Sequence, residues 1–215
     1  MARTPQAKPG PRRDHALAQY RRRAAVYDLE LRLFEPLRRQ AVDWLAPAKG
    51  ATVLDVGCGT GLSFPLLQAF IGTAGRIVGI EQSAPMLERA RQRVQQQGWR
   101  NVQLLNSAAE DAPLQGRADA ALLHLTHDVM QNDDALARVL AHLRPGAMVV
   151  ATGLKWAPWW SAPLNLLVLP AALRSVSSLQ GLECPWQRLA RRLVHLDVRQ
   201  QAGGTLYLAR GQVPP

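Results

Sequence analysis

Short apolar runs alternate with amphipathic stretches along most of this chain. The runs have the length of buried strands, whereas the stretches repeat apolar residues at helical spacing. Leu33, Leu37, Val42 and Leu45, for example, have a roughly helical spacing. The pattern predicts strands at residues 52–56, 76–81, 102–105, 118–123 and 147–152. It predicts helices at residues 14–27, 29–45, 61–71 and 133–142, and another that has Ser83 as its N-cap and stops at Gly98.

Towards the end of the chain the alternation loosens. We expect a turn at residues 144–146, a helix near 185–194, and strands at 195–199 and 206–209 joined by a turn at Gly203-Gly204. Strands that alternate with helices form a parallel sheet that is covered on both faces. The sequence therefore predicts an α/β fold: one Rossmann-like, doubly wound domain whose seven-stranded, mostly parallel sheet has an antiparallel edge strand.

The first strand leads into a loop with glycines at alternate positions, Gly57, Gly59 and Gly61, just after Asp55. Glycine has no Cβ and tolerates positive φ, so a ligand can approach the bare backbone. A dinucleotide loop would have its third glycine where this chain has Leu62, and a phosphate loop needs a lysine that is absent here. The loop therefore favours a nucleoside-containing ligand that needs no phosphate cradle.

Three runs, residues 53–61, 79–87 and 143–146, resemble class I S-adenosylmethionine-dependent methyltransferases in order and spacing. The likeness is greatest to the small-molecule group that includes ubiquinone and menaquinone methyltransferases, and it covers about residues 40–153. It implies S-adenosyl-L-methionine as the cofactor and a small-molecule or lipid-like methyl acceptor.

The resemblance also implies roles for individual residues. Gly57, Cys58, Gly59 and Gly61 would lie against the methionine and ribose parts, with Cys58 as a small filler rather than a nucleophile. Asp55 would support the loop and the cationic amino group. The two ribose hydroxyls would be accepted by Glu81, and carboxylates suit such donors because charged hydrogen bonds are the stronger ones.

On the adenine side the resemblance points to residues after the second and third strands. These are Met86, Ala109 and Glu110. Gln82 and His124 are further cofactor-binding candidates, and His124, at the end of the fourth strand, is also a candidate base. Many relatives have aspartate where this chain has Ala108, so Asp111, Glu110 or the backbone near Ala109 would have to replace that partner.

Methyl transfer needs alignment and exclusion of water, and a base only when the acceptor must lose a proton. His127 is the preferred catalytic residue, because histidine is a natural base near neutral pH. Asp128 would orient it, and Tyr27 would contact the methionine end or the acceptor. Structural roles remain open for these side chains, and the H-x-x-H-D cluster lacks partners for a metal site, so none is expected.

The net charge is +10, and residues 1–49 hold 11 basic against five acidic side chains. Such a charge attracts anionic partners but also fits a solvated surface. No basic motif with interleaved aromatic residues is present, so a nucleic-acid partner is not expected. The two cysteines are far apart and no secretory signal stands at the N-terminus, so we expect a cytoplasmic setting.

The chain divides into a disordered tail at residues 1–11, N-terminal helices at 12–48 that cover the site, and the methyltransferase domain at 49–215. An apolar insertion at about 154–184 holds 18 uncharged residues, from 156 to 173. Its tryptophans would stack on a flat acceptor or bury a cap. Two alternatives stay open: a phospholipid or quinone methyltransferase at the inner face of the membrane, and a nucleic-acid-binding protein.

Overall fold

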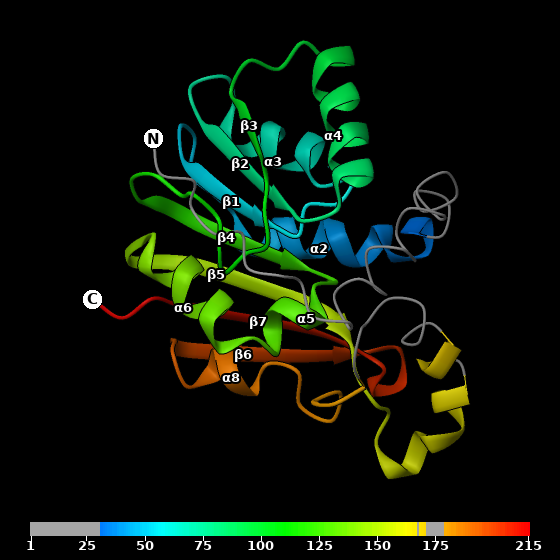
Figure 1. Ribbon diagram of the computed structural model, residues 1–215. Helices are drawn as coiled ribbons and strands as arrows, with labels where there is room; N and C mark the ends of the chain where they lie inside the picture. Colours follow the sequence, from blue (N-terminus) through cyan, green and yellow to red (C-terminus); the bar gives the residue numbers. More distant parts are fainter. Residues whose placement is uncertain (1–30, 167, 171–178) are drawn as a thin grey trace, which may run out of the picture.

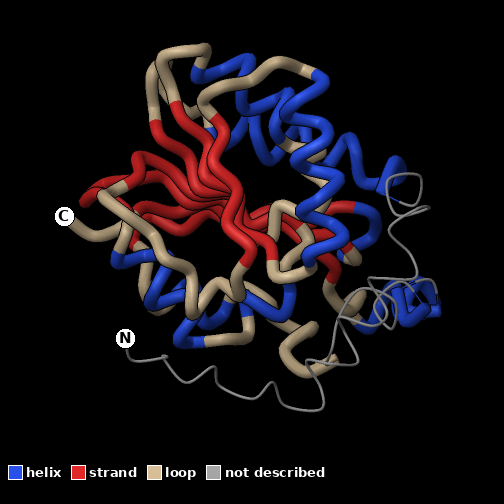
Figure 2. Tube along the Cα trace, turned by 45° about the horizontal axis from the view of Figure 1, so that its top comes forward, coloured by secondary structure: helices blue, strands red, loops and turns tan. Residues whose placement is uncertain are grey.

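The computed structural model describes residues 31–166, 168–170 and 179–215. The tail predicted at 1–11, the helix predicted at 14–27, and Tyr27 lie outside these residues. Helices lie on both faces of one twisted sheet, in three layers (Figures 1 and 2). The predicted α/β class is confirmed.

Seven strands form the described sheet, in the order β3-β2-β1-β4-β5-β7-β6. Their bounds are β1 Thr52–Val56, β2 Arg76–Glu81, β3 Val102–Asn106, β4 Ala118–His124, β5 Leu143–Leu154, β6 Val194–Gln201 and β7 Leu206–Gln212. β1 to β5 are parallel, and β7 is antiparallel to its neighbours β5 and β6. The mostly parallel sheet is thus as predicted, and its antiparallel pairings lie at the edge that β6 forms.

Two apolar clusters fill the spaces between the sheet and the helices. One lies under α2 (Glu35–Leu45), α3 (Phe64–Ile71) and α4 (Ala84–Gln96), and the other under α5 (His127–Met130), α6 (Asp133–Ala141) and α8 (Gln187–Ala190). Neighbouring residues of a strand point to opposite faces. Val53 therefore belongs to the first cluster and Leu54 to the second, which is why β1 reads as an uninterrupted apolar run.

The helix after the glycine loop begins at Phe64, three residues later than predicted. Gly61 has a φ of +76°, and a Cβ there would lie 2.5 Å from the Phe64 ring, so the loop must turn before the helix can start. Ser83 stands at the N-cap of α4 as predicted, but its side chain makes no capping hydrogen bond.

The end of the chain differs from the prediction in length rather than in order. The helix expected at 185–194 is only α8, because Val194 already pairs with Gln212 of β7. The two last strands are longer than predicted and are joined by η3 (Ala202–Gly204). The expected turn at 144–146 is an irregularity within β5, where Gly146 has a φ of +76° and the pairing with β4 shifts register.

One 3-10 helix precedes α2, and another lies near the start of the insertion. η1 (Leu31–Phe34) leads into α2, and η2 (Trp159–Leu164) is kinked at Ser161 and contains Pro163. Figure 1 shows η2 projecting from the body of the domain. Within the described part of the chain, no helix has both the length and the apolar character of a membrane span.

Gly57 sets the direction in which the chain leaves β1. Its φ is +68°, and a Cβ at this position would lie 2.4 Å from Cγ2 of Thr126, in the segment after β4. Two constraints therefore act at once: a left-handed backbone, and close packing against a segment that is distant in the sequence.

Replacing Gly57 by alanine should lower the free energy of unfolding by about 2–5 kcal/mol, because left-handed strain adds to an overpacked contact. Gly50→Ala is the matched control: its φ is +81° but nothing lies within 4 Å of its added Cβ, so the loss should be about 1–2 kcal/mol. Adding Thr126→Ser to Gly57→Ala removes the clashing methyl and should recover the difference. Equal losses for both alanine variants in denaturant unfolding would contradict the packing argument.

Candidate functional site

The carboxyl ends of three neighbouring strands meet at one edge of the sheet. Asp55 of β1 pairs in register with Gly79 of β2 and Leu122 of β4. The end residues Glu81 and His124 therefore flank the end of β1, one on each side (Figure 1). In open α/β sheets, ligands bind outside this edge, where the connections leave in opposite directions.

A pocket lies above the end of β1, between the glycine loop, the segment after β4, and α2. Its lining residues are Arg38, Asp55, Gly57, Cys58, Gly59, Thr60, Leu62, Ser63, His124 and Leu125. The structure thus brings together Asp55, three residues of the glycine loop and His124, which were all predicted for one site. Arg38 was not predicted, and it comes from α2, one of the elements expected to cover the site.

Glu81 ties the glycine loop to the start of α4. Its Oε2 accepts a hydrogen bond from the Gly59 N–H at 3.1 Å, and its Oε1 accepts one from the Ser83 N–H at 2.7 Å. Burial raises the pKa of this carboxyl, and the backbone donors act in the opposite direction. The carboxylate therefore both shapes the loop and presents its remaining lone pairs at the end of β2.

Asp55 is buried, with 1% of its surface exposed, and its Oδ2 has no hydrogen-bond partner. Burial raises its pKa to about 7, partly offset by the positive charge of Arg38 and reinforced by the negative charge of Glu81. A buried carboxylate without a partner is unfavourable, and a cation in the pocket would relieve it. The site is therefore electrostatically suited to a positively charged group.

His124 faces the pocket from the end of β4. Its Nδ1 lies 2.7 Å from the Thr152 Oγ1 of β5, and its Nε2 is buried without a partner. Burial and, to a lesser degree, the nearby Arg38 lower its pKa to about 3. His124 is thus an uncharged hydrogen-bonding group at neutral pH and is a poor proton acceptor there.

The Cys58 side chain packs into the core rather than acting at the site. Its Sγ would lie 2.9 Å from a Cβ on Gly79, and the residue belongs to the apolar cluster under α2 to α4. Burial raises the pKa of the thiol well above its usual value. Because the thiolate is the nucleophilic form, this geometry fits a filler and not a nucleophile.

The segments expected at the adenine side lie next to each other beyond β2. The Asn106 side chain donates to the carbonyl oxygens of Glu81 at 2.9 Å and Gln82 at 3.2 Å, and the Ser107 N–H donates to the Glu81 carbonyl. Met86 is buried in the first turn of α4, Ala109 is buried, and Glu110 and Gln82 are half-buried. The predicted adenine residues thus come from two loops that Asn106 fastens together.

His127 lies at the start of α5 and is not among the pocket-lining residues. Its Nε2 donates to the Gln180 carbonyl in the insertion at 2.9 Å, and its Nδ1 is buried without a partner. Asp128 follows it and is half-buried. This hydrogen bond ties the segment after β4 to the insertion.

Three residues that shape the site were missed by the sequence reasoning. Asn106 ends an ordinary strand and Thr152 lies inside one, so local pattern marks neither. Arg38 is one of 23 arginines, and helical periodicity alone does not say which of them faces a pocket. Within the described ranges, no group of three His, Cys, Asp or Glu residues is arranged to hold a metal ion.

Residues 53–146 match the family model described as a methyltransferase domain. The chain is 37% identical over 89 residues to the aklanonic acid methyltransferase DauC of Streptomyces sp. (strain C5). This match covers 40% of each protein. It is 42% identical over 81 residues to a 2-phytyl-1,4-naphtoquinone methyltransferase of Thermosynechococcus vestitus, covering 35% of this chain and 36% of the relative. The matches thus span about two fifths of the length of these relatives.

Solved structures extend the likeness in fold to most of the chain. The N-methyltransferase NodS of Bradyrhizobium japonicum WM9 superposes with a TM-score of 0.63 at 18% identity, covering 85% of this chain and 97% of NodS. A geranyl diphosphate methyltransferase superposes with a TM-score of 0.65 at 19% identity, covering 84% and 78%. Residues 53–146 are thus similar to a methyltransferase domain, and the fold over most of the chain is that of S-adenosylmethionine-dependent methyltransferases.

Proposed function

We propose that this chain transfers a methyl group from S-adenosylmethionine to a small-molecule or lipid-like acceptor. The observation that carries the proposal is the pocket at the end of β1, which is lined by Asp55 and the glycine loop, while Glu81 holds that loop through the Gly59 N–H. Relatives named as methyltransferases of aklanonic acid, of a phytyl-naphthoquinone and of nocamycin support the acceptor class.

Two observations on Asp55 and Glu81 support binding of the cofactor at this site. The partnerless Oδ2 of Asp55 suits the amino group of the methionine part, which is a cation. The Glu81 oxygens each accept one backbone hydrogen bond and keep lone pairs for the two ribose hydroxyls. In this proposal Gly57, Gly59 and Gly61 let the ligand approach the backbone. The proposed contacts of the adenosine part are Gln82, Met86, Ala109 and Glu110.

When bound, S-adenosylmethionine supplies an electrophilic methyl group on a sulfonium. The protein must then align the acceptor and exclude water. His124 is suited to this setting because its pKa of about 3 keeps it uncharged, so it can hydrogen-bond without placing a second positive charge beside the sulfonium.

On the acceptor side we propose His127 as the base for acceptors that must lose a proton. The Gln180 carbonyl only accepts, so the Nε2 of His127 carries the hydrogen and Nδ1 is the basic atom of the neutral ring. This Nδ1 has no partner. Asp128 as an orienting residue and Tyr27, which lies outside the described residues, complete the proposed set.

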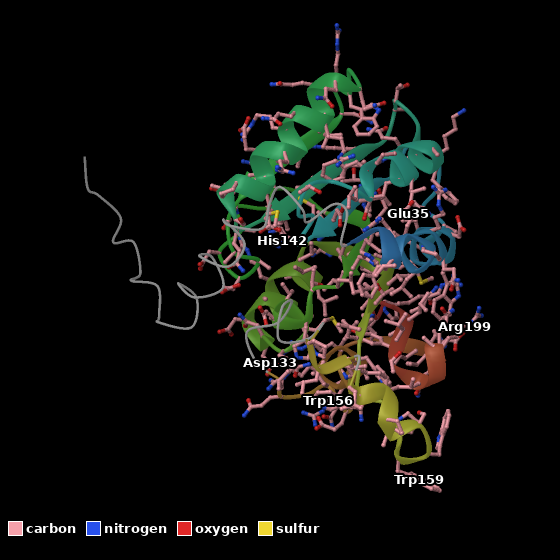
Figure 3. All side chains as sticks on the ribbon, turned by 90° about the vertical axis from the view of Figure 1, so that its right-hand side faces the viewer. Glu35, Asp133, His142, Trp156, Trp159 and Arg199 are labelled. Carbon is pink, nitrogen blue, oxygen red and sulfur yellow. The ribbon has the colours of Figure 1, made fainter. Side chains whose placement is uncertain are left out.

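Methylation of a phospholipid or quinone at a membrane surface is the second candidate. Trp159 and Trp160 are 88% and 64% exposed, and Leu166 on the same segment is 76% exposed. Figure 3 shows Trp159 at the far end of this segment, away from the sheet. Tryptophan favours the membrane interface, and the charge of +10 favours anionic lipid, so a peripheral position at the inner membrane face is part of this candidate.

A nucleic-acid acceptor has less support. It rests on the net charge and on relatives such as the 23S rRNA (uracil(1939)-C(5))-methyltransferase RlmD of Pseudomonas aeruginosa, of which this chain covers 20%. No observation at the described site favours a nucleic acid over a small acceptor.

Methyl-labelled S-adenosylmethionine, incubated with the protein and cell extract, tests the proposal directly. Label should appear in the small-molecule or lipid pool after fractionation, and the lipid pool alone would favour the membrane-surface candidate. Label confined to the protein or nucleic-acid pool would contradict the proposed acceptor class. Extract without the protein gives the background.

Glu81→Gln should weaken the binding of S-adenosylhomocysteine at least ten-fold, measured by titration calorimetry. The variant replaces a charged acceptor by a neutral amide whose NH₂ group opposes backbone donors. Glu88→Gln is the matched control, because Glu88 pairs with Arg91 on the exposed face of α4 and should leave affinity unchanged. A folded Glu81→Gln variant with wild-type affinity would refute the ribose assignment.

Asp55→Asn should abolish tight binding of the same ligand yet stabilise the free protein at high pH. The pKa of Asp55 is about 7 when folded and about 3.9 when unfolded, so the folded chain holds its proton more tightly. The stability that Asp55 contributes is therefore present at low pH and is lost as pH rises towards 7. Asparagine does not titrate.

Denaturant unfolding at pH 5 and pH 8 checks this prediction. The Asp55→Asn variant should gain on the wild type between the two pH values by up to a few kcal/mol, since one pKa unit corresponds to about 1.4 kcal/mol. The exposed Asp43→Asn is the control and should follow the wild type. Parallel pH profiles for wild type and Asp55→Asn would show that Asp55 carries no such shift.

A further inference from the structure

Basic side chains gather at the edge of the sheet that lies opposite the proposed cofactor site. The parallel strands β1 to β5 all begin at this amino edge and end at the other. Each of the five has an exposed cation close to its first residue. In the order of the strands in the sheet, these cations are Arg100 (β3), Arg76 (β2), Lys49 (β1), Arg117 (β4) and Arg144 (β5).

Two cavities at the amino edge show that these cations lie side by side. Lys49 and Arg144 line a groove of about 430 Å³ on the face of the sheet that α2 covers. Arg76 and Arg117 line a second cavity on the face that α6 covers. Neighbouring strands are about 4.8 Å apart, so the five cations form one band about 20 Å long across the end of the sheet.

Little negative charge balances this band. Asp119 is the only acid that lines either cavity, and it forms an ion pair with Arg144. Arg76 donates to the side-chain oxygen of Gln103, which is neutral. The other three cations make no ion pair and no side-chain hydrogen bond with a residue that the structure describes. Most of the charge of the band is therefore available to a partner.

The ends of the neighbouring helices do not account for the band. A cation offsets the negative end of a helix when it lies in the last turn, and the effect falls off beyond that turn. α2 and α3 have no basic residue in their last turns, whereas α4 and α6 have Arg93 and Arg138 there. The five cations of the band all lie beyond these turns, in the connections to the strands or at the strand starts.

The turns beside these cations are open. Gly50, Gly98, Gly116 and Gly146 each lie within two residues of a cation of the band. No described residue comes within 4 Å of a Cβ built on any of these four glycines. A long anionic partner can therefore follow the band from strand to strand without meeting a bulky side chain in the turns.

We propose that the amino edge binds the phosphodiester backbone of a nucleic acid, independently of base sequence. A linear polyanion matches a row of single charges, and four of the five cations are arginines, whose planar fork suits phosphate. Neither cavity is lined by Phe, Tyr or Trp, so binding rests on the backbone rather than on stacked bases. A membrane fits this edge less well, because the exposed Trp159 and Trp160 lie in η2, which follows the carboxyl end of β5 (Figure 1).

The nucleic acid is a partner in this inference and not the methyl acceptor. β1 has five residues and is about 17 Å long, and it separates the amino edge from the pocket that Asp55 lines. Binding at the amino edge therefore leaves the pocket free, and the inference stands apart from the proposed function.

The test is the salt dependence of binding to a fluorescently labelled oligouridylate, followed by anisotropy on the full chain. Each contact to a single strand contributes about −0.7 to the slope of log K against log salt concentration. Lys49→Gln/Arg117→Gln removes two exposed cations that have no ion pair, so the slope should become shallower by about 1.4 and the affinity at about 0.1 M salt should fall at least ten-fold. Each single variant should show about half of the change in slope.

Arg39→Gln/Arg188→Gln is the matched control, since it removes the same charge from exposed positions in α2 and α8 that pair with Glu35 and Asp133. Its slope should stay at the wild-type value and its affinity should change less than two-fold. Because residues 1–30 hold further cations, the comparison of the two double variants decides the question.

Three results would overturn the inference. The first is a wild type that does not bind the oligouridylate, and the second is an equal loss in both double variants, which would show an effect of net charge alone. The third is an edge variant that loses binding to phosphatidylglycerol vesicles but keeps binding to the oligouridylate, which would assign the edge to lipid. Binding of S-adenosylhomocysteine should be the same in all variants, and its absence in the wild type would refute the proposed function and not this inference.

Discussion

The site depends on one carboxylate that holds two backbone segments together. Glu81 ends β2 and accepts hydrogen bonds from the N–H groups of Gly59 in the loop and Ser83 at the start of α4. Without an anion in this place, both N–H groups would need other partners, because buried backbone donors are almost always satisfied. The positive φ of Gly57 and its contact with Thr126 fix the other end of the same loop.

Next to the loop that Glu81 holds, the pocket contains ionisable side chains that lack full pairing within the protein. Asp55 and Arg38 both line the pocket and are buried, and each has one polar side-chain atom without a hydrogen-bond partner. Burial of charged groups costs desolvation free energy, which is repaid only when the groups are well paired. The arrangement is intelligible when a ligand of matching charge completes it, because binding then recovers the free energy that burial of the two groups costs.

The family match covers only part of the segments that surround the proposed site. The match to the methyltransferase family covers residues 53–146, which include Asp55 and Glu81. Arg38 precedes this range, and the insertion that carries the exposed Trp159 and the carbonyl partner of His127 follows it. The match therefore covers the proposed cofactor residues Asp55 and Glu81 as well as His127, whereas α2 and the insertion lie outside it.

The sequence alone determined the order of strands and helices and the places where Asp55 and Glu81 end β1 and β2. Apolar runs, their period and the nearby glycines are local properties, and they decide which segments form strands. The start of α3, the length of α8 and the burial of Arg38 were decided only by the tertiary structure. The last two depend on distant partners: α8 ends early because Val194 pairs with β7, and Arg38 lines the pocket because α2 brings it next to Asp55 and His124. Local pattern shows that a residue is polar, but only packing shows which polar residues are enclosed together without water.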